Sequence, residues 1–310
     1  MRRLPIIILM LFILPSLAWG QRKTGTAGAQ FLELGVSARA AGMGEAFLAV
    51  ADDASALYYN PSGLTQIGQK ELVLTHVDYI AGITYDFGGI SIPTSRLGGV
   101  VGLGIYFLNS GDIPNIKTST TDPSNPDQTY QAKEYALALT YARSLTDRFS
   151  IGTTLKFIDE LYEEERANGW AVDVGTMYRT DFKNFRIGVM MSNFGSDLKF
   201  IKEEYPLPIN FKFGISMEPV TYGEHKALIG LELSHPNDNL EKFNSGVEYW
   251  YRDILALRVG NQFGYDAGDF SFGAGVKLPF YNKTKLRVDY GYHDFGFLSE
   301  VHRFTLNLSF

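Results

Sequence analysis

The chain ends on the stretch "HRFTLNLSF", residues 302–310, in which large apolar and polar residues alternate strictly. Phe304, Leu306, Leu308 and Phe310 share one face, because successive side chains of a β-strand point to opposite sides. The last residue is a bare aromatic with no polar tail behind it. This pattern predicts a final strand that pairs with another strand, because a free edge cannot be left unpaired in an apolar environment.

The same period-two pattern recurs along most of the chain. From residue 71 onward, about fourteen short segments alternate in this way, and turn-forming residues separate them. The predicted strands are 71–79, 83–92, 99–109, 131–143, 148–159, 169–179, 184–194, 208–217, 226–235, 243–251, 254–262, 269–278, 285–293 and 301–310.

The two faces of these strands differ in a way that distinguishes two all-β architectures. In one strand, for example, Phe211, Phe213 and Ile215 share one face, and Lys212 and Gly214 share the other. A soluble β-sandwich would bury the bulky face between two sheets. A transmembrane barrel instead turns the bulky face toward lipid and the small or polar face toward its lumen. The many glycines on the second face favour the barrel, because glycine weakens a strand that faces solvent.

The connections between the predicted strands support a barrel of this kind. An even number of strands places both ends of the barrel in the periplasm, so short turns should alternate with longer extracellular loops. Residues 144–147 and 180–183 fit short turns, and the longest connection, 110–130, falls on the outer side. The predicted fold is therefore an antiparallel transmembrane β-barrel of about 14 strands.

The N-terminus carries the features of an export signal. Arg2 and Arg3 precede the apolar run "LPIIILMLFILPSLAW", residues 4–19, which is too short and too early for a spanning helix. Ala18 and Gly20 provide small residues at cleavage spacing, so cleavage is expected before Gln21. A retained membrane anchor is the alternative interpretation of this run.

Composition excludes several classes of function. The sequence has no cysteine, which rules out disulfides, thiolate metal sites and a thiol nucleophile. A formal net charge of −6, spread along the chain, gives no reason to expect nucleic acid as a partner. No histidine pair has metal-ligand spacing, and no nucleophile lies beside a base; we expect no enzyme activity, no cofactor and no metal.

The predicted lumen is close to neutral and rich in glycine. Its expected cations are Lys156, Arg186, Lys212, Arg258, Lys277, Arg287 and Arg303, and its expected anions are Asp86, Glu134, Asp173, Glu232, Glu248 and Asp289. An ion-selective pore would carry rings of one sign. Balanced charges instead indicate internal ion pairs, and inward glycines leave room for another segment of backbone to enter.

Residues 21–70 are the expected occupant of that lumen. They lack alternation and are rich in small residues, so we divide the chain into a signal peptide (1–20), an N-terminal plug containing short helices (21–70) and a barrel (71–310). Asp52 or Asp53 is expected to cap a short helix that ends before a proline. The residues expected to form the plug motif are Ala41, Gly42, Met43, Gly44, Asp52, Asp53, Ala54, Asn60, Pro61, Gly63 and Leu64.

The stretch "GVSARAAGMGEAFLAVADDASALYYNPSGL", residues 35–64, resembles the N-terminal signature of the PorV/PorQ family of outer-membrane proteins. That family is similar to the FadL-type transporters of hydrophobic compounds, which carry an Asn-Pro-Ala-Gly-Leu-like stretch; here Ser62 replaces the alanine. The resemblance implies a plugged fourteen-stranded barrel in a Gram-negative outer membrane. It also implies work in type IX secretion, where such proteins dock or deliver exported cargo.

Two functions of different classes remain open from the sequence. The first is a docking protein whose partners are secretion components or exported cargo; the second is a passive transporter of hydrophobic small molecules. In either case, the surrounding lipid is a partner. The terminal Phe310 also resembles the signature that the outer-membrane assembly machinery recognises, which makes that machinery an expected partner as well.

Overall fold

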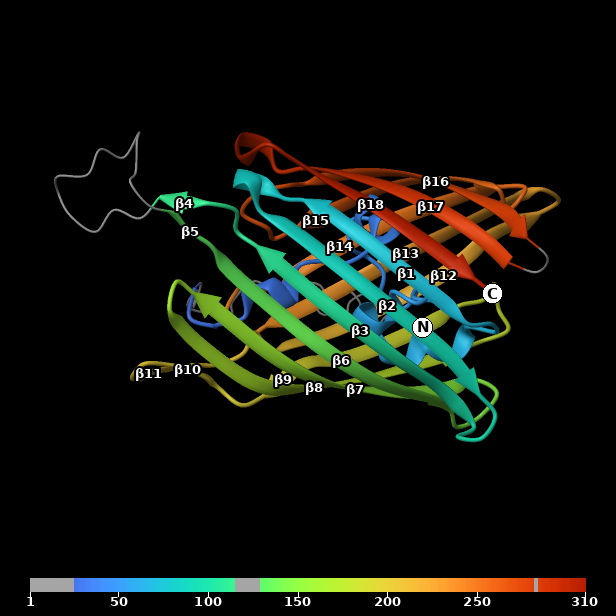
Figure 1. Ribbon diagram of the computed structural model, residues 1–310. Coiled ribbons are helices and arrows are strands. Elements are labelled where there is room, and N and C mark those ends of the chain that lie inside the picture. Colours follow the sequence, from blue (N-terminus) through green and yellow to red (C-terminus); the bar gives the residue numbers. More distant parts are fainter. Residues whose placement is uncertain (1–24, 115–128, 282–283) are drawn as a thin grey trace, which may run out of the picture.

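In the computed structural model, which describes residues 25–114, 129–281 and 284–310, fourteen antiparallel strands close into one barrel (Figure 1). This confirms the predicted fold class. The expected signal peptide and much of the loop 110–130 lie outside the described residues. The barrel strands are β1 (Glu71–Asp78), β2 (Thr84–Thr94), β3 (Gly99–Asn109), β6 (Ala132–Ser144), β7 (Phe149–Tyr162), β8 (Glu165–Arg179), β9 (Arg186–Gly195), β12 (Asn210–Tyr222), β13 (His225–Pro236), β14 (Lys242–Tyr251), β15 (Leu255–Phe263), β16 (Phe270–Tyr281), β17 (Thr284–Asp294) and β18 (Glu300–Ser309).

The last strand closes the barrel against the first. Strand β18 pairs with β1 and places Leu308 opposite Leu72. The backbone N–H of Phe310 then donates to the carbonyl of Lys70 at 2.9 Å. Because β18 pairs with both β17 and β1, neither edge of the sheet is left free.

The bulky face of the strands points outward, as a lipid-facing barrel requires. Leu137 on β6 is 50% exposed, whereas Lys156 on β7, one position from the cross-strand partner of Leu137 and therefore on the inner face, is 2% exposed. An apolar side chain outside and a charged one inside is the reverse of a soluble fold. The alternation therefore reports the inverted pattern of a membrane barrel.

The two ends of the barrel differ in their connections. The end that carries the C-terminus has short connections, such as Gly223–Glu224, and is called the short-turn end here. The other, long-loop end carries two small hairpins, which project beyond the barrel at the left of Figure 1. Their strands are β4 (Ile113–Pro114), β5 (Thr129–Tyr130), β10 (Leu198–Phe200) and β11 (Glu203–Tyr205).

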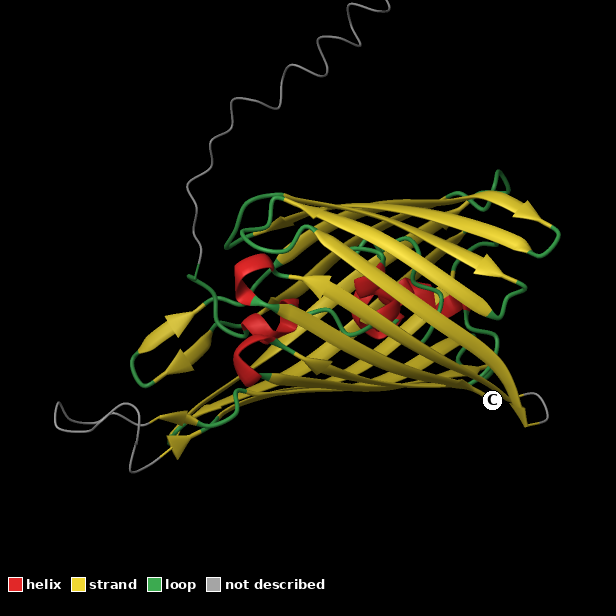
Figure 2. Cartoon of the chain, turned by 90° about the horizontal axis from the view of Figure 1, so that it is seen from above, coloured by secondary structure: helices red, strands yellow, loops and turns green. Residues whose placement is uncertain are grey.

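Short helices within the barrel belong to the residues that precede β1 (Figure 2). They are η2 (Gln30–Glu33), α2 (Ala38–Gly42), α3 (Ala56–Tyr59) and η3 (Pro61–Gln66), and single turns η4 (Ile80–Gly82) and η5 (Gly296–Leu298) lie in the loops before β2 and β18. None of the helices in the described part of the chain is long and apolar enough to cross a lipid bilayer. Residues 25–70 are called the N-terminal segment below.

One expected lumen residue lies on the opposite face. Asp86 points outward, where its carboxylate lies 2.6 Å from His76 Nδ1, and Tyr85 and Phe87 on either side point inward and are buried. Strand β2 therefore turns aromatic rings toward the lumen, where Phe87 packs against Tyr106 on β3. The prediction was wrong here because the N-terminal segment supplies an apolar partner inside the barrel.

The expected helix cap also differs from the structure. Helix α3 begins at Ala56, after Ser55, so neither aspartate stands at its N-cap. Asp53 instead accepts hydrogen bonds from the backbone N–H and the hydroxyl of Ser55, at 2.9 and 2.5 Å. The helix ends at Tyr59, directly before Asn60 and Pro61, as the proline predicts.

Candidate functional site

A ring of glycines on the inner wall receives the N-terminal segment. Each of these glycines has so little space in front of it that an added Cβ would press on the segment. The ring, called the glycine belt here, consists of Gly89, Gly102, Gly152, Gly175, Gly188, Gly214, Gly230, Gly246, Gly260, Gly273 and Gly291, one on each of eleven strands. Glycine is the residue that permits such close backbone approach.

The contacts of the N-terminal segment with the glycine belt run around the wall from Ala38 at β17 to Leu64 at β3. Leu57 departs from this order, because it contacts Gly89 on β2 and Gly102 on β3 before Asn60 meets β8. The neighbouring pairs are Ala38 with Gly291, Gly42 with Gly273, Met43 with Gly246, Ala46 with Gly230, Leu48 with Gly214, Asn60 with Gly175, Pro61 with Gly152 and Leu64 with Gly102.

The approach is closest where glycines face each other across the contact. A Cβ on Gly42 would lie 2.8 Å from the Cα of Gly273, and one on Gly260 would overlap the backbone of Met43 and Gly44. Gly44 also has a positive φ of 61°, which suits a residue without a Cβ. Because the obstructing atoms are backbone, they cannot rotate away as a side chain would.

Buried ion pairs tie the N-terminal segment to the wall at its short-turn side. The guanidinium of Arg39 binds both carboxylate oxygens of Glu248, at 2.8 and 2.7 Å, and also Asp52 at 2.5 Å. Arg287 binds Asp53 at 2.5 Å. Arg258 lies between Glu248 and Asp289, at 2.6 and 2.8 Å, and extends the network along the wall. The lumen charges thus find partners in the segment.

The electrostatic environment keeps Asp53 ionised. Burial alone would raise the pKa of the Asp53 carboxyl, but the Arg287 and Arg39 guanidinium groups outweigh burial and hold that pKa below its usual value. A lowered folded-state pKa means that the ion pairs stabilise the fold above the unfolded-state pKa of about 3.9. Their contribution is lost only as the pH falls through the folded-state value.

Hydrogen bonds from the wall satisfy the backbone of the N-terminal segment where it forms no helix. The carboxylate of Glu232 accepts from the N–H groups of Phe47 and Leu48, at 3.1 and 2.9 Å. The hydroxyls of Ser271 and Thr305 accept from Gly44 and Ala38, each at 2.9 Å. Glu45 additionally pairs with Arg303 and accepts from the Tyr59 hydroxyl at 2.8 Å.

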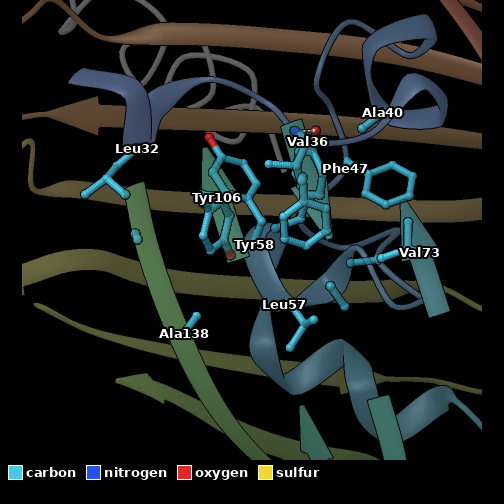
Figure 3. Packing of buried hydrophobic residues seen from close by; sticks show 14 of the residues in the cluster. Leu32, Val36, Ala40, Phe47, Leu57, Tyr58, Val73, Tyr106 and Ala138 are labelled. Carbon is cyan, nitrogen blue, oxygen red and sulfur yellow. Dashed lines mark hydrogen bonds between the residues drawn. The ribbon is translucent and has the colours of Figure 1, made fainter. Parts of the chain in front are cut away.

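An apolar cluster holds the centre of the segment against β1, β2 and β3. Figure 3 shows the ring of Tyr58 beside that of Tyr106, with Leu57 and Phe47 close by. The Tyr58 and Tyr106 centroids are 6.3 Å apart, and Leu57 is fully buried against Gly89 of β2. These contacts fill the part of the lumen that the charge network does not reach.

The N-terminal segment leaves one cavity on each side. The larger, about 550 Å³, opens toward the long-loop end, and both apolar residues such as Phe31 and Ile83 and polar residues such as Lys212 and Asn244 line it. The smaller, about 260 Å³, opens toward the short-turn end beside Trp250. No described cavity extends from one end to the other.

The expected plug-motif residues fall into three structural groups. Ala41, Gly42, Met43 and Gly44 lie on the belt between β14 and β17. Asp52 and Asp53 join the ion pairs, and the N–H of Ala54 donates to Glu71 at 3.0 Å. Asn60, Pro61, Gly63 and Leu64 form the last turn, where Asn60 Nδ2 donates to the carbonyls of Leu48 and Thr176.

Sequence reasoning missed the residues that link this motif to the wall. Arg39 and Glu45 lie within the quoted signature but were given no role, and Glu71 was predicted only as the first residue of a strand. The available signal was charge: Arg39 is the single cation between residues 25 and 69. Because a buried charge needs partners, a single arginine entering a lumen with several carboxylates is expected to pair with them.

No candidate metal centre is found in the residues that the structure describes. They contain no group of three or more His, Cys, Asp or Glu side chains placed to hold a metal ion. His293 lies against Phe295 with ring centroids 4.5 Å apart, while Asp289 binds Arg258 and Arg287.

Comparisons with known proteins agree with this architecture. A family model described as "Type IX secretion system protein PorV" matches residues 18–236, more than half of the chain. No curated protein sequence matches this chain.

Several solved structures have a similar fold. The Ralstonia pickettii toluene transporter TbuX has a TM-score of 0.61 at 14% identity, over 88% of this chain and 97% of that one. The monoaromatic hydrocarbon channel CymD has a TM-score of 0.58 at 13% identity, over 89% and 98%. A Pseudomonas aeruginosa FadL homologue has a TM-score of 0.56 at 10% identity, over 89% and 98%. At these identities the likeness shows the fold alone.

Proposed function

The chain belongs to the PorV family of type IX secretion system proteins, and we propose that it docks exported proteins at the extracellular end of a closed barrel. It is an outer-membrane β-barrel, so its long-loop end faces outward and its short-turn end faces the periplasm. Residues 21–70 act as a plug in this proposal, and the cargo passes beside the barrel rather than through it.

The observation that carries the proposal is the division of the lumen. The glycine belt, the ion pairs around Arg39 and the cluster at Tyr58 occupy successive parts of the cross-section. A folded or extended polypeptide has no route through such a barrel. The larger cavity, called the outer cavity here, opens toward the long-loop end instead. Its walls are both apolar and polar, which suits contact with a peptide segment.

The second candidate function is passive transport of hydrophobic small molecules. It is favoured by the similarity of the fold to barrels described as toluene and monoaromatic hydrocarbon transporters. Such transport needs a continuous apolar path. The smaller cavity, called the periplasmic cavity here, is instead lined by charged groups such as Arg39, Lys277 and Arg287. We therefore place docking first.

No catalytic step and no cofactor enters the proposal. Phe310 is assigned to recognition by the outer-membrane assembly machinery, an assignment supported by its position at the paired end of β18. The expected partners are thus membrane lipid, that machinery, secretion components and exported cargo, and not nucleic acid.

Site-specific photo-crosslinking tests the proposal directly. A photoreactive phenylalanine analogue at Ile83, which lines the outer cavity, should capture exported proteins in living cells. The same analogue at Trp250, which lines the periplasmic cavity, serves as the matched control and should capture fewer. Capture of exported proteins at Trp250 but not at Ile83 would exclude extracellular docking.

A further inference from the structure

The outer, lipid-facing side of the wall carries an apolar recess of about 870 Å³. Strands β1, β2, β3, β6, β7 and β8 form it, and all its lining residues are apolar or glycine. The recess is shallow and open to the lipid side, so an occupant would lie along the wall with one side against it.

Strand register explains where the recess comes from. One row of outward residues runs straight across the six strands as Leu74, Gly88, Ile105, Leu137, Phe157 and Trp170. Gly88 is the one member without a side chain, so the row is interrupted there. The gap is flanked by the ends of Leu74 and Ile105, which lie 3.6 and 3.3 Å from where its Cβ would stand.

A charged group lies directly above this gap. On the extracellular side, the next row begins with His76 and Asp86, which face each other across β1 and β2. His76 Nδ1 lies 2.6 Å from Asp86, and its Nε2 lies 3.2 Å from Asp78. All three side chains are about half exposed, between 48% and 59%. Two carboxylates share one imidazole, so the group is acidic at neutral pH whichever state the histidine adopts.

We propose that the recess at Gly88 binds an acyl chain of an outer-leaflet lipid whose headgroup carries an amine. The lining offers only hydrocarbon contacts, and the membrane that surrounds this wall supplies hydrocarbon chains at that depth. The acidic group at Asp86 and Asp78 complements an ammonium and repels an anionic headgroup. This inference goes beyond the docking function and does not depend on it.

Fluorescence quenching by brominated lipids tests the site. The reporter is Phe107→Trp, next to Asp86 across β2 and β3, in full-length protein that also carries Trp19→Phe, Trp170→Phe and Trp250→Phe. In phosphatidylcholine vesicles, brominated phosphatidylethanolamine should half-quench the reporter at a mole fraction about threefold to fivefold lower than brominated phosphatidylglycerol. That factor is what one partly exposed ion pair provides.

Three variants separate this site from general lipid contact. Gly88→Leu should fill the gap, so that brominated phosphatidylethanolamine no longer half-quenches the reporter at the lower mole fraction. Asp78→Asn/Asp86→Asn should make the two brominated lipids half-quench the reporter at equal mole fractions. Ala274→Leu makes a similar change on another outward face, beside Leu257 and Tyr290, and should leave both effects intact. Quenching that follows only the bulk lipid fraction, identically in every variant, would overturn the proposal. So would export loss in Gly88→Leu cells with unchanged quenching, because a protein would then be the occupant.

Discussion

Gly260→Ala should open the barrel to small solutes. The added methyl group would overlap the backbone of Met43 and Gly44, which cannot rotate away, so the N-terminal segment must leave the wall. Overpacking of this kind typically costs about 1–3 kcal/mol, and adding Gly246→Ala on the neighbouring strand should increase the cost. We expect clear swelling of proteoliposomes in a sugar solution with the double variant and little with the unaltered protein.

Gly104→Ala provides the matched control for this result. Gly104 also faces inward, but its Cβ would meet only side chains at 3.5 Å or more, an ordinary contact distance. This variant should remain as closed as the unaltered barrel. If both variants stayed closed, and hydrogen exchange of residues 38–48 were unchanged in the double variant, the glycine belt would not be what seats the segment.

Arg39→Ala should detach the same segment by a different route. The substitution leaves the buried carboxylates of Glu248 and Asp53, and the partly exposed Asp52, with fewer cationic partners, and loss of one member of a buried ion network typically costs about 3–5 kcal/mol. Faster protease cleavage between residues 38 and 60, in a barrel that still shows its heat-dependent shift on a gel, is the expected result.

Arg148→Ala is the control for the loss of an arginine. Arg148 pairs with Asp181 near the short-turn rim, and both side chains are more than half exposed. An exposed pair contributes about 0–1 kcal/mol, so this variant should be cleaved like the unaltered protein. Equal cleavage of both variants would show that the network around Arg39 does not hold the segment.

The barrel itself could be predicted from the sequence because its signal is local. Alternation in a stretch such as residues 99–109 depends only on which face meets lipid, and this strand occupies those residues in the structure. Strand β2 was misassigned at Asp86 because its inner face packs on Tyr106 and the N-terminal segment. A contact with distant residues leaves no periodic trace in the strand that makes it.

The site was only partly predictable for the same reason. Inward glycines indicated that backbone would enter the lumen, and residues such as Gly42 and Asn60 were placed in the motif that does so. The pairing of each glycine with its own residue of the segment depends on strand register and on the path of the chain. The role of Arg39 depends on three carboxylates, one of them Glu248, 209 residues away. Neither the glycine contacts nor these ion pairs can be predicted from the spacing of residues along the sequence.

We propose that this barrel serves secretion rather than the transport of hydrophobic molecules. Deleting its gene and comparing exported proteins with toluene uptake in the same cells tests that claim most directly. We expect exported proteins to accumulate in the periplasm, toluene uptake to be unchanged, and the unaltered gene to restore export. Normal export together with lost uptake would contradict it.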